Sequence, residues 1–238
     1  MRVFAGPNGS GKTTIFKGIL AEKSIQLGIF VNADEIEQML HHSGVIDFSA
    51  FNIRVRDTQL KDFFVKSTFS PIKRHEPDLY KKISVIKNLF STTAKIDSYL
   101  AADLADFIRE QLLKNNISFT YETVMSHPDK IHFLTKALKN GYRVYLYFVA
   151  TEDPEINIAR VNVRVAQHGH AVAANVIKNR YYKSLGNLKQ AVSQTSRAYI
   201  FDNSQKQANL IAEITDGTEV ALNTDVELPY WVVKNLLN

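Results

Sequence analysis

Hydrophobic and polar positions along the chain predict strands separated by helices. Apolar residues recur every three or four positions in several segments, such as Leu100, Leu104 and Ile108, and this spacing is typical of one buried helix face. Short apolar runs typical of buried strands occur between such segments, at residues 2–5, 29–31, 118–121, 142–150 and 198–201. The alternation predicts an α/β fold with a central, mostly parallel five-stranded sheet.

Two segments depart from this alternation. Residues 44–99 are polar and dotted with phenylalanines, which predicts a helical insertion with an aromatic core of its own; a ligand-binding platform is the alternative. The pattern near the C-terminus predicts a hairpin followed by a short helix. It consists of residues 219–222, then Asn223-Thr224-Asp225, then residues 226–233. No repeat or linker divides the chain, so we expect a single domain over residues 1–238.

The first predicted strand runs directly into GPNGSGKT at residues 6–13, which has the G-x-x-x-x-G-K-[ST] spacing of a P-loop. Glycines let the backbone wrap around phosphate oxygens, Lys12 can reach the β- and γ-phosphates, and the Thr13 hydroxyl can bind Mg²⁺. A glycine-rich turn that binds nothing is the alternative. We predict that a nucleoside triphosphate is bound by Gly6, Asn8, Gly9, Ser10, Gly11, Lys12, Thr13 and Thr14.

Composition narrows the classes of protein that fit. The chain of 238 residues is 45% hydrophobic, enough for one substantial core. Its net charge of +5 suits a polyphosphate pocket, and because the basic residues are dispersed, nucleic acid is not expected as a partner. The chain has no cysteine, which excludes disulfides and thiolate metal sites. No apolar run is long enough to cross a bilayer and no signal precedes the first strand, so we expect a soluble cytoplasmic protein.

ABC-type ATPases often share this form of P-loop, and residues 144–153 superficially imitate their apolar strand ending in an acidic pair. Such proteins also need a signature similar to S-G-G-Q shortly before that pair, and residues 126–143 contain none. Ser184-Leu185-Gly186-Asn187 is a poor imitation and comes after the strand. The ABC interpretation is therefore disfavoured.

The chain instead resembles the zeta-toxin family of P-loop kinases. The resemblance is carried by GPNGSGKTT at 6–14, VNADE at 31–35, YETVMS at 121–126, YFVATEDPEINIARVNVRVAQHGHAV at 147–172, NRYYKSL at 179–185 and YIFDNS at 199–204. Residues 44–99 and about the last twenty lie outside it. The resemblance implies a P-loop nucleoside-kinase-like three-layer fold. It also implies γ-phosphate transfer from ATP or GTP, with Mg²⁺, to a hydroxyl of a UDP-activated amino sugar such as UDP-N-acetylglucosamine, and an antitoxin protein as a partner.

Two carboxylates follow predicted strands at the sheet edge where α/β proteins bind ligands. Asp34 matches the family's catalytic aspartate and would deprotonate the attacking hydroxyl; the alternative is the N-cap of a helix over residues 35–40. Asn32 binds substrate or ends the strand. By resemblance Glu122, assisted by Thr123, contacts the substrate or water around Mg²⁺, although a solvated residue at a strand end is the alternative.

Residues 154–188 are expected to form a lid. Arg160 and Arg164 share a face of a helix that Asp153 caps, and guanidinium pairs of this kind clamp phosphates in kinases. Arg180 resembles a further phosphate-binding arginine of the family, so we predict Lys12, Asp34, Arg164 and Arg180 as catalytic and Arg160 as nucleotide-binding. Surface arginines in weak ion pairs are the alternative. By resemblance, Asn203 lies beside the purine base.

The lid departs from the family pattern in its loop. His168-Gly169-His170 and Val172-Ala173 stand where the family commonly has G-G-H and V-P, which removes backbone freedom at the hinge and loosens the start of the next helix. Lys183-Ser184 stands where the family commonly has R-S. Lysine keeps the positive charge, but it lacks the guanidinium group with which arginine makes two parallel hydrogen bonds.

A nucleotide-binding regulatory or interaction protein with weak NTPase activity, engaging a partner through residues 44–99, is the competing function. The two hypotheses differ in their need for the Asp34 carboxylate.

Overall fold

The computed structural model describes residues 1–21, 25–67, 69–167 and 171–238. The chain divides into two compact units, the first made of Met1–Leu27 with Thr120–Asn238 and the second of Gly28–Phe119. The second unit contains the insertion expected at residues 44–99 and extends beyond it in both directions. A single domain over the whole chain stays a prediction.

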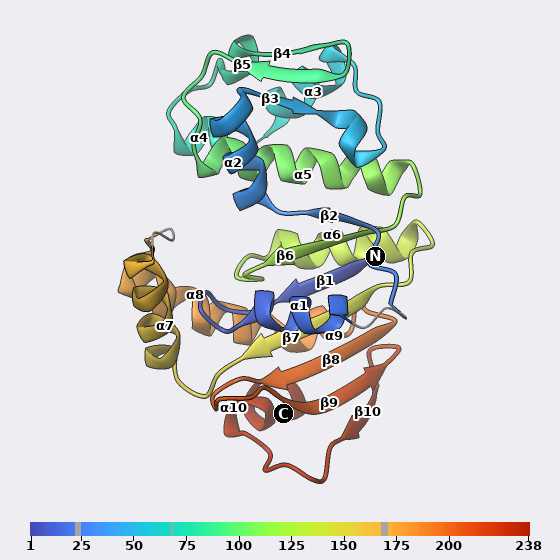
Figure 1. The fold of residues 1–238 in the computed structure, drawn as a ribbon. Helices are drawn as coiled ribbons and strands as arrows, with labels where there is room; N and C mark the ends of the chain where they lie inside the picture. The colour runs from blue at the N-terminus through green and yellow to red at the C-terminus, as the bar shows by residue number, and fades with distance from the viewer. Residues whose placement is uncertain (22–24, 68, 168–170) are drawn as a thin grey trace. The chain divides into compact units, whose positions relative to one another are not determined.

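The first unit is built on a mostly parallel sheet (Figure 1). Its strands lie in the order β10-β9-β8-β7-β1-β6, with β6, β1, β7 and β8 parallel and β9 and β10 antiparallel. The bounds are β1 Arg2–Ala5, β6 Phe119–Thr123, β7 Tyr145–Ala150, β8 Arg197–Asp202, β9 Asn209–Thr215 and β10 Glu219–Leu222. The α/β class is confirmed, but the sheet has more strands than the five predicted, because β9 and β10 add an antiparallel edge.

Helices cover both faces of this sheet. Phe16 packs edge-on against Phe4 with ring centroids 5.2 Å apart, and Phe133 packs edge-on against Tyr121 at 5.9 Å. Tyr121 pairs with Val3 in the register, so it points to the face opposite Phe4. The helices are α1 Lys12–Ala21, α6 Pro128–Lys139, α7 Pro154–Ala166, α8 Ala174–Gly186, α9 Leu188–Val192 and α10 Tyr230–Val232, which continues as a π-helix over Val233–Leu237. None of the helices in the described ranges could cross a membrane.

The C-terminal hairpin exists, but its turn differs from the prediction. Strands β9 and β10 are joined at Asp216 and Gly217, whose φ angles of 48° and 72° suit a tight hairpin turn. Asn223, expected in the turn, instead follows β10 and donates its side-chain amide to Leu210 O at 2.9 Å. The sequence pattern did not reveal β9, because its polar residues obscured the strand signal.

The second unit is mixed and not purely helical. It contains β2 Ile29–Val31, α2 Ala33–Ser43, β3 Val45–Asp47, a 3₁₀ turn Phe48–Phe51, α3 Asp57–Lys66, α4 Ser70–Lys73, a 3₁₀ turn Leu79–Lys82, β4 Ile83–Ile86, β5 Leu89–Thr92 and α5 Ser98–Lys114. Strands β3, β5 and β4 form an antiparallel sheet in that order. The insertion predicted as helical therefore carries a sheet, whose β4–β5 turn uses Lys87 and Asn88 at positive φ.

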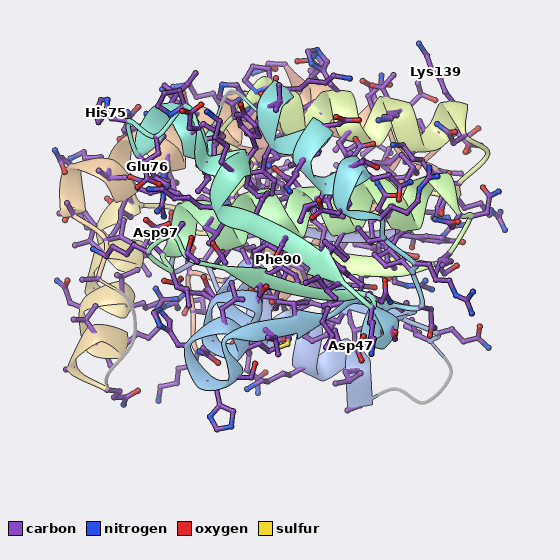
Figure 2. All side chains as sticks on the ribbon, turned by 90° about the horizontal axis from the view of Figure 1, so that it is seen from above. Asp47, His75, Glu76, Phe90, Asp97 and Lys139 are labelled. Carbon is purple, nitrogen blue, oxygen red and sulfur yellow. The ribbon has the colours of Figure 1, made fainter. Side chains whose placement is uncertain are left out.

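Aromatic side chains form the core of the second unit, as expected. Phe90 on β5, labelled in Figure 2, is fully buried and lies 6.5 Å from Phe48 between ring centroids, while Phe48 lies 5.9 Å from Phe107. Glu76 and Asp97 lie at one end of this unit (Figure 2), where both pair with the nearly buried Arg74 at 2.9 and 2.6 Å. The pairing compensates the Arg74 charge inside the unit.

Candidate functional site

The P-loop begins where the buried strand β1 ends at Ala5. Gly6, Gly9 and Gly11 have φ angles of +137°, +75° and +96°, values that residues with a side chain rarely adopt. Gly6 N also donates to Thr123 O at 3.2 Å, which joins the loop to the end of β6. The loop conformation therefore depends on glycine at these positions, as the sequence predicts.

Lys12 begins helix α1 and bends back over the loop. Its ammonium donates to Gly6 O at 2.9 Å and to Pro7 O at 2.8 Å. The same helix directs the backbone N–H groups of its first turn and the positive end of its dipole at the loop. A fixed cation and a helix N-terminus at one loop are together suited to binding a phosphate group.

Thr13 and Glu122, which the sequence separates by more than a hundred residues, meet beside the loop. Thr13 Oγ1 donates to Glu122 Oε2 at 3.2 Å. The contact arises because β1 and β6 are parallel neighbours, with Phe4 opposite Glu122, so the chain leaves both strands at the same edge. Hydroxyl and carboxylate oxygens are the ligands that Mg²⁺ prefers, so this pair fits the ion. Thr123 Oγ1 accepts from Met125 N at 3.2 Å and so shapes the chain after β6.

Mg²⁺ would need further ligands at this position. The described residues contain no group of three or more His, Asp or Glu side chains that could hold a metal by themselves. Mg²⁺ is commonly bound by one or two protein oxygens together with water and substrate phosphates. Thr13 and Glu122 fit that arrangement and not a protein cage.

Asn157, which the sequence analysis did not single out, ties helix α7 to the P-loop. Its fully buried side chain donates from Nδ2 to Asn8 O at 2.7 Å and accepts a hydrogen bond from the Thr151 hydroxyl. Thr151 O in turn accepts from the Tyr181 hydroxyl on α8 at 2.6 Å. The helical spacing offered a signal, because Asn157 lies one turn before the buried Val161 and a polar residue on a buried face needs partners.

The same contact adds a second reason for Gly9. A Cβ atom at this position would lie 2.5 Å from Asn157 O, closer than van der Waals contact allows. Gly9 thus serves both the shape of the loop and its packing on α7.

Asn203, expected beside the purine base by resemblance, contacts the P-loop directly. Its side chain donates to Ser10 O at 2.8 Å, while its backbone N–H donates to Ala150 O at 2.8 Å. A side chain at Gly11 would collide with the Asn203 amide. The described contacts make Asn203 a support for the loop backbone, and a role at the base stays a prediction.

The arginines of the expected lid have different surroundings. Arg160 is half-buried and donates to Asn203 O at 2.7 Å, whereas Arg164 and Arg180 have exposed side chains. Asp153 caps α7 as predicted, accepting from Glu155 N at 2.8 Å. In Figure 1, α7 lies beyond the end of the sheet to which β1, β7 and β8 point.

The departures from the family pattern in the lid can be followed only in part. His168, Gly169 and His170 lie outside the described residues. Helix α8 begins at Ala174 after Ala173, which makes no side-chain capping bond. Lys183 is exposed and Ser184 is buried.

Asp34 and Asn32 belong to the second unit. The N-cap of α2 is Asn32, whose Oδ1 accepts from Asp34 N at 2.8 Å. The alternative of Asp34 as the N-cap is therefore wrong, because an Asn two residues earlier already holds that position. Asp34 has an exposed side chain in the first turn of α2. The pKa of the neighbouring Glu35 carboxyl is raised, chiefly by partial burial and further by the Asp34 charge.

Comparison with known proteins matches the chain to one family. The family described as "Zeta toxin" matches residues 91–215, just over half of the chain. An uncharacterized protein of Haemophilus influenzae is 35% identical over 69 residues, which make up 29% of this chain and 49% of that protein. The chain thus spans about half the length of the curated relative it matches.

Solved structures share the fold at low sequence identity. The AvrRxo1-ORF1:AvrRxo1-ORF2 complex with sulphate ions has a TM-score of 0.54 at 12% identity, covering 93% of this chain and 60% of that one. The same complex with ATP has a TM-score of 0.50 at 13% identity, covering 94% and 60%. A structure from the PezAT chromosomal toxin-antitoxin system of Streptococcus pneumoniae has a TM-score of 0.50 at 15% identity, covering 85% and 66%.

Proposed function

Because this chain belongs to the zeta toxin family, we propose that it is a phosphotransferase that binds ATP or GTP with Mg²⁺ at its P-loop. The observation that carries the proposal is the meeting of Lys12, Thr13 and Glu122 at one glycine-dependent loop. Phosphoryl transfer needs positioning and charge stabilisation more than covalent chemistry from the protein. A cation, a helix N-terminus and a pair of Mg²⁺-binding oxygens supply those needs.

Each residue of the loop takes a separate role in this proposal. Lys12 and the backbone N–H groups hold the β- and γ-phosphates, and Mg²⁺ bound by Thr13 and Glu122 would neutralise charge between them. Arg160, Arg164 and Arg180 would contact the phosphates from the lid helices, where guanidinium groups stabilise the charge of the transition state. Arg160 already lies beside Asn203, which supports the loop.

We propose Asp34 as the general base that accepts the proton of the attacking hydroxyl. The support is chemical: Asp34 is an exposed carboxylate whose helix is capped by Asn32, so its oxygens are not needed for capping. A general base must be reachable by substrate, and an exposed first-turn residue meets that condition. Asn32 takes a structural role in the cap, and substrate binding by its amide is part of the proposal.

The acceptor proposed is a hydroxyl of a UDP-activated amino sugar, on the ground of family membership alone. A protein partner acting as antitoxin is proposed on the same ground, with support from the Streptococcus pneumoniae relative, which comes from a toxin-antitoxin system. A nucleotide-dependent enzyme of this kind would work in the cytoplasm, where its phosphate donor is found.

The test measures transfer of labelled γ-phosphate from ATP and from GTP, with Mg²⁺, to UDP-sugars, nucleosides and water. Wild type should phosphorylate a UDP-amino sugar. Lys12→Ala should lose nucleotide binding and transfer together, while Asp34→Asn should lower kcat by about 10²-fold to 10⁴-fold and keep nucleotide affinity.

Matched controls separate these effects from damage to the fold. Lys17→Ala removes an exposed lysine from the same helix as Lys12, and Glu35→Gln changes the carboxyl next to Asp34; both should keep wild-type transfer. Nucleotide binding with hydrolysis only, unchanged in Asp34→Asn, would contradict the kinase and favour a nucleotide-controlled binding protein.

A further inference from the structure

A chain of hydrogen bonds in the first unit connects the C-terminal helix to the P-loop. It begins at Trp231 on α10, a side chain only 3% exposed, whose indole Nε1 donates to Asp202 Oδ2 at 2.7 Å. The Trp231 ring also packs near Phe148 of β7, with centroids 6.3 Å apart. The contact is the point where the C-terminal helix meets the end of β8.

Asp202 holds the loop that follows β8. Its Oδ1 accepts from Ser204 N at 3.0 Å and its Oδ2 from Ser204 Oγ at 3.0 Å. Ser204 Oγ also accepts from Glu152 N at 2.9 Å, which joins this loop to the loop after β7. Asp202 is 6% exposed, so these donors and the Trp231 indole take the place of water around its oxygens.

The residue held between Asp202 and Ser204 is Asn203, and its side chain supports the P-loop at Ser10 O. Arg160 Nη1 fixes the same residue from the lid helix by donating to Asn203 O at 2.7 Å. The position of the Asn203 amide is therefore set from both sides. A displacement of the loop after β8 would move the group on which Ser10 and Gly11 rest.

We propose that Trp231 is a positioning residue for the nucleotide site, acting through Asp202 and Asn203 on the P-loop. The inference rests on the proposed binding of a nucleoside triphosphate at that loop. It extends the proposed function to the C-terminal helix, which lies after the residues 91–215 that match the family. The loop N–H groups bind phosphate well only when their directions are fixed in advance, and this contact contributes to fixing them.

The experiment measures MgATP affinity by calorimetry on the full chain, well below the melting temperature of each variant. Trp231→Phe keeps a ring in the core and removes the indole donor, and Asn203→Ala removes the amide that reaches Ser10. Each change should weaken MgATP binding by about fivefold to tenfold, the effect of losing one supporting hydrogen bond. Asn223→Ala is the matched control, because Asn223 is also half-buried and also donates to a backbone carbonyl, but on the β9–β10 side. It should bind like wild type.

The double variant distinguishes positioning from general destabilisation. If Trp231 acts through Asn203, Trp231→Phe should cause no further loss of affinity in the Asn203→Ala background. Should Trp231→Phe fail to fold, Ser204→Ala loosens the same loop by a smaller change and should weaken MgATP in the same direction.

Three results would overturn the inference. Wild-type affinity in a folded Trp231→Phe or Ser204→Ala protein contradicts it, and so do losses that add in the double variant. A wild type that does not bind MgATP at all overturns the proposed function and this inference with it. If the wild type binds MgATP and a folded Trp231→Phe or Ser204→Ala protein binds it equally well, this inference alone is overturned and the proposed function stands.

Discussion

At the scale of single residues, Gly9 of the P-loop and Gly18 of helix α1 differ in what a side chain would meet. Gly9 has φ +75° and a Cβ there would press on Asn157 O, whereas Gly18 lies in helix α1 with nothing within 4 Å of an added Cβ. The same substitution should therefore have opposite effects at the two positions.

Gly9→Ala should lower the free energy of unfolding by about 1–3 kcal/mol, because alanine at positive φ is strained and pushes on α7. It should also weaken MgATP binding. Gly18→Ala should raise the free energy of unfolding by about 1 kcal/mol, since glycine is the poorer helix former. Urea unfolding and nucleotide titration of both variants measure this, and equal effects at the two positions would contradict the packing argument.

At the scale of elements, helices α7 and α8 of the expected lid begin in different ways. Helix α7 has Asp153 as its N-cap, Pro154 in its first turn and Asn157 bonded to the P-loop. Helix α8 begins after Ala173, which has φ −62° and no side-chain capping bond. The expected loosening of this helix start by the loss of the family's proline stays a prediction.

Restoring that proline should stabilise α8. Ala173→Pro fits the backbone, because proline fixes φ near −65°, and it should raise the free energy of unfolding by about 0.4–1 kcal/mol through the unfolded chain. Val176→Pro is the contrast: Val176 N donates to Ala173 O at 2.9 Å, so proline there removes a bond and should destabilise. Denaturant unfolding of both variants measures the effect, and loss of stability in Ala173→Pro would show that the helix start is not limiting.

At the scale of the whole molecule, the carboxyl groups whose pKa values are lowered by ion pairs lie in the second compact unit. The hydrogen bond and charge of Arg74 lower the pKa of Glu76, and the Lys61 ammonium lowers the pKa of Asp57; both carboxyls lie in the second unit. A carboxyl with a lowered folded pKa stabilises above its unfolded pKa, and that stability is lost as the pH falls through the folded pKa. Acid should therefore weaken the second unit.

The single tryptophan makes this measurable, because Trp231 lies in the first unit and reports on that unit alone. Below a pH of about 4, near the unfolded values of these carboxyls, unfolding followed by far-UV circular dichroism should begin at lower urea than unfolding followed by Trp231 fluorescence. Glu76→Gln should reduce the difference in urea concentration between the two transitions at acidic pH. Asp78→Asn changes an exposed neighbouring carboxyl and should leave that difference unchanged. If the two transitions coincide at acidic as well as at neutral pH, acid does not weaken the second unit separately from the first, and the prediction is contradicted.

The sequence by itself determined the parts that depend on neighbours along the chain. The P-loop, the strand before it and the helix after it lie within residues 2–21, and their spacing and periodicity predicted them. The Asp153 cap and the parallel strands followed from equally local patterns. The resemblance to zeta toxins also rested on short motifs, and the family match confirms it.

Only the tertiary structure decided how distant residues meet around that loop. Asn157 and Asn8 are 149 positions apart, and Asn203 and Ser10 are 193 apart, so no local pattern connects them. Strand β9 and the sheet of the second unit escaped prediction for a related reason: strand pairing depends on partners outside the segment. Residues 219–222, which form β10, were expected to pair in the C-terminal hairpin with the segment after them, but they pair with β9, the segment before them. Local sequence sets the conformation of the P-loop, and buried polar groups from remote segments hold it there because each must find a hydrogen-bond partner.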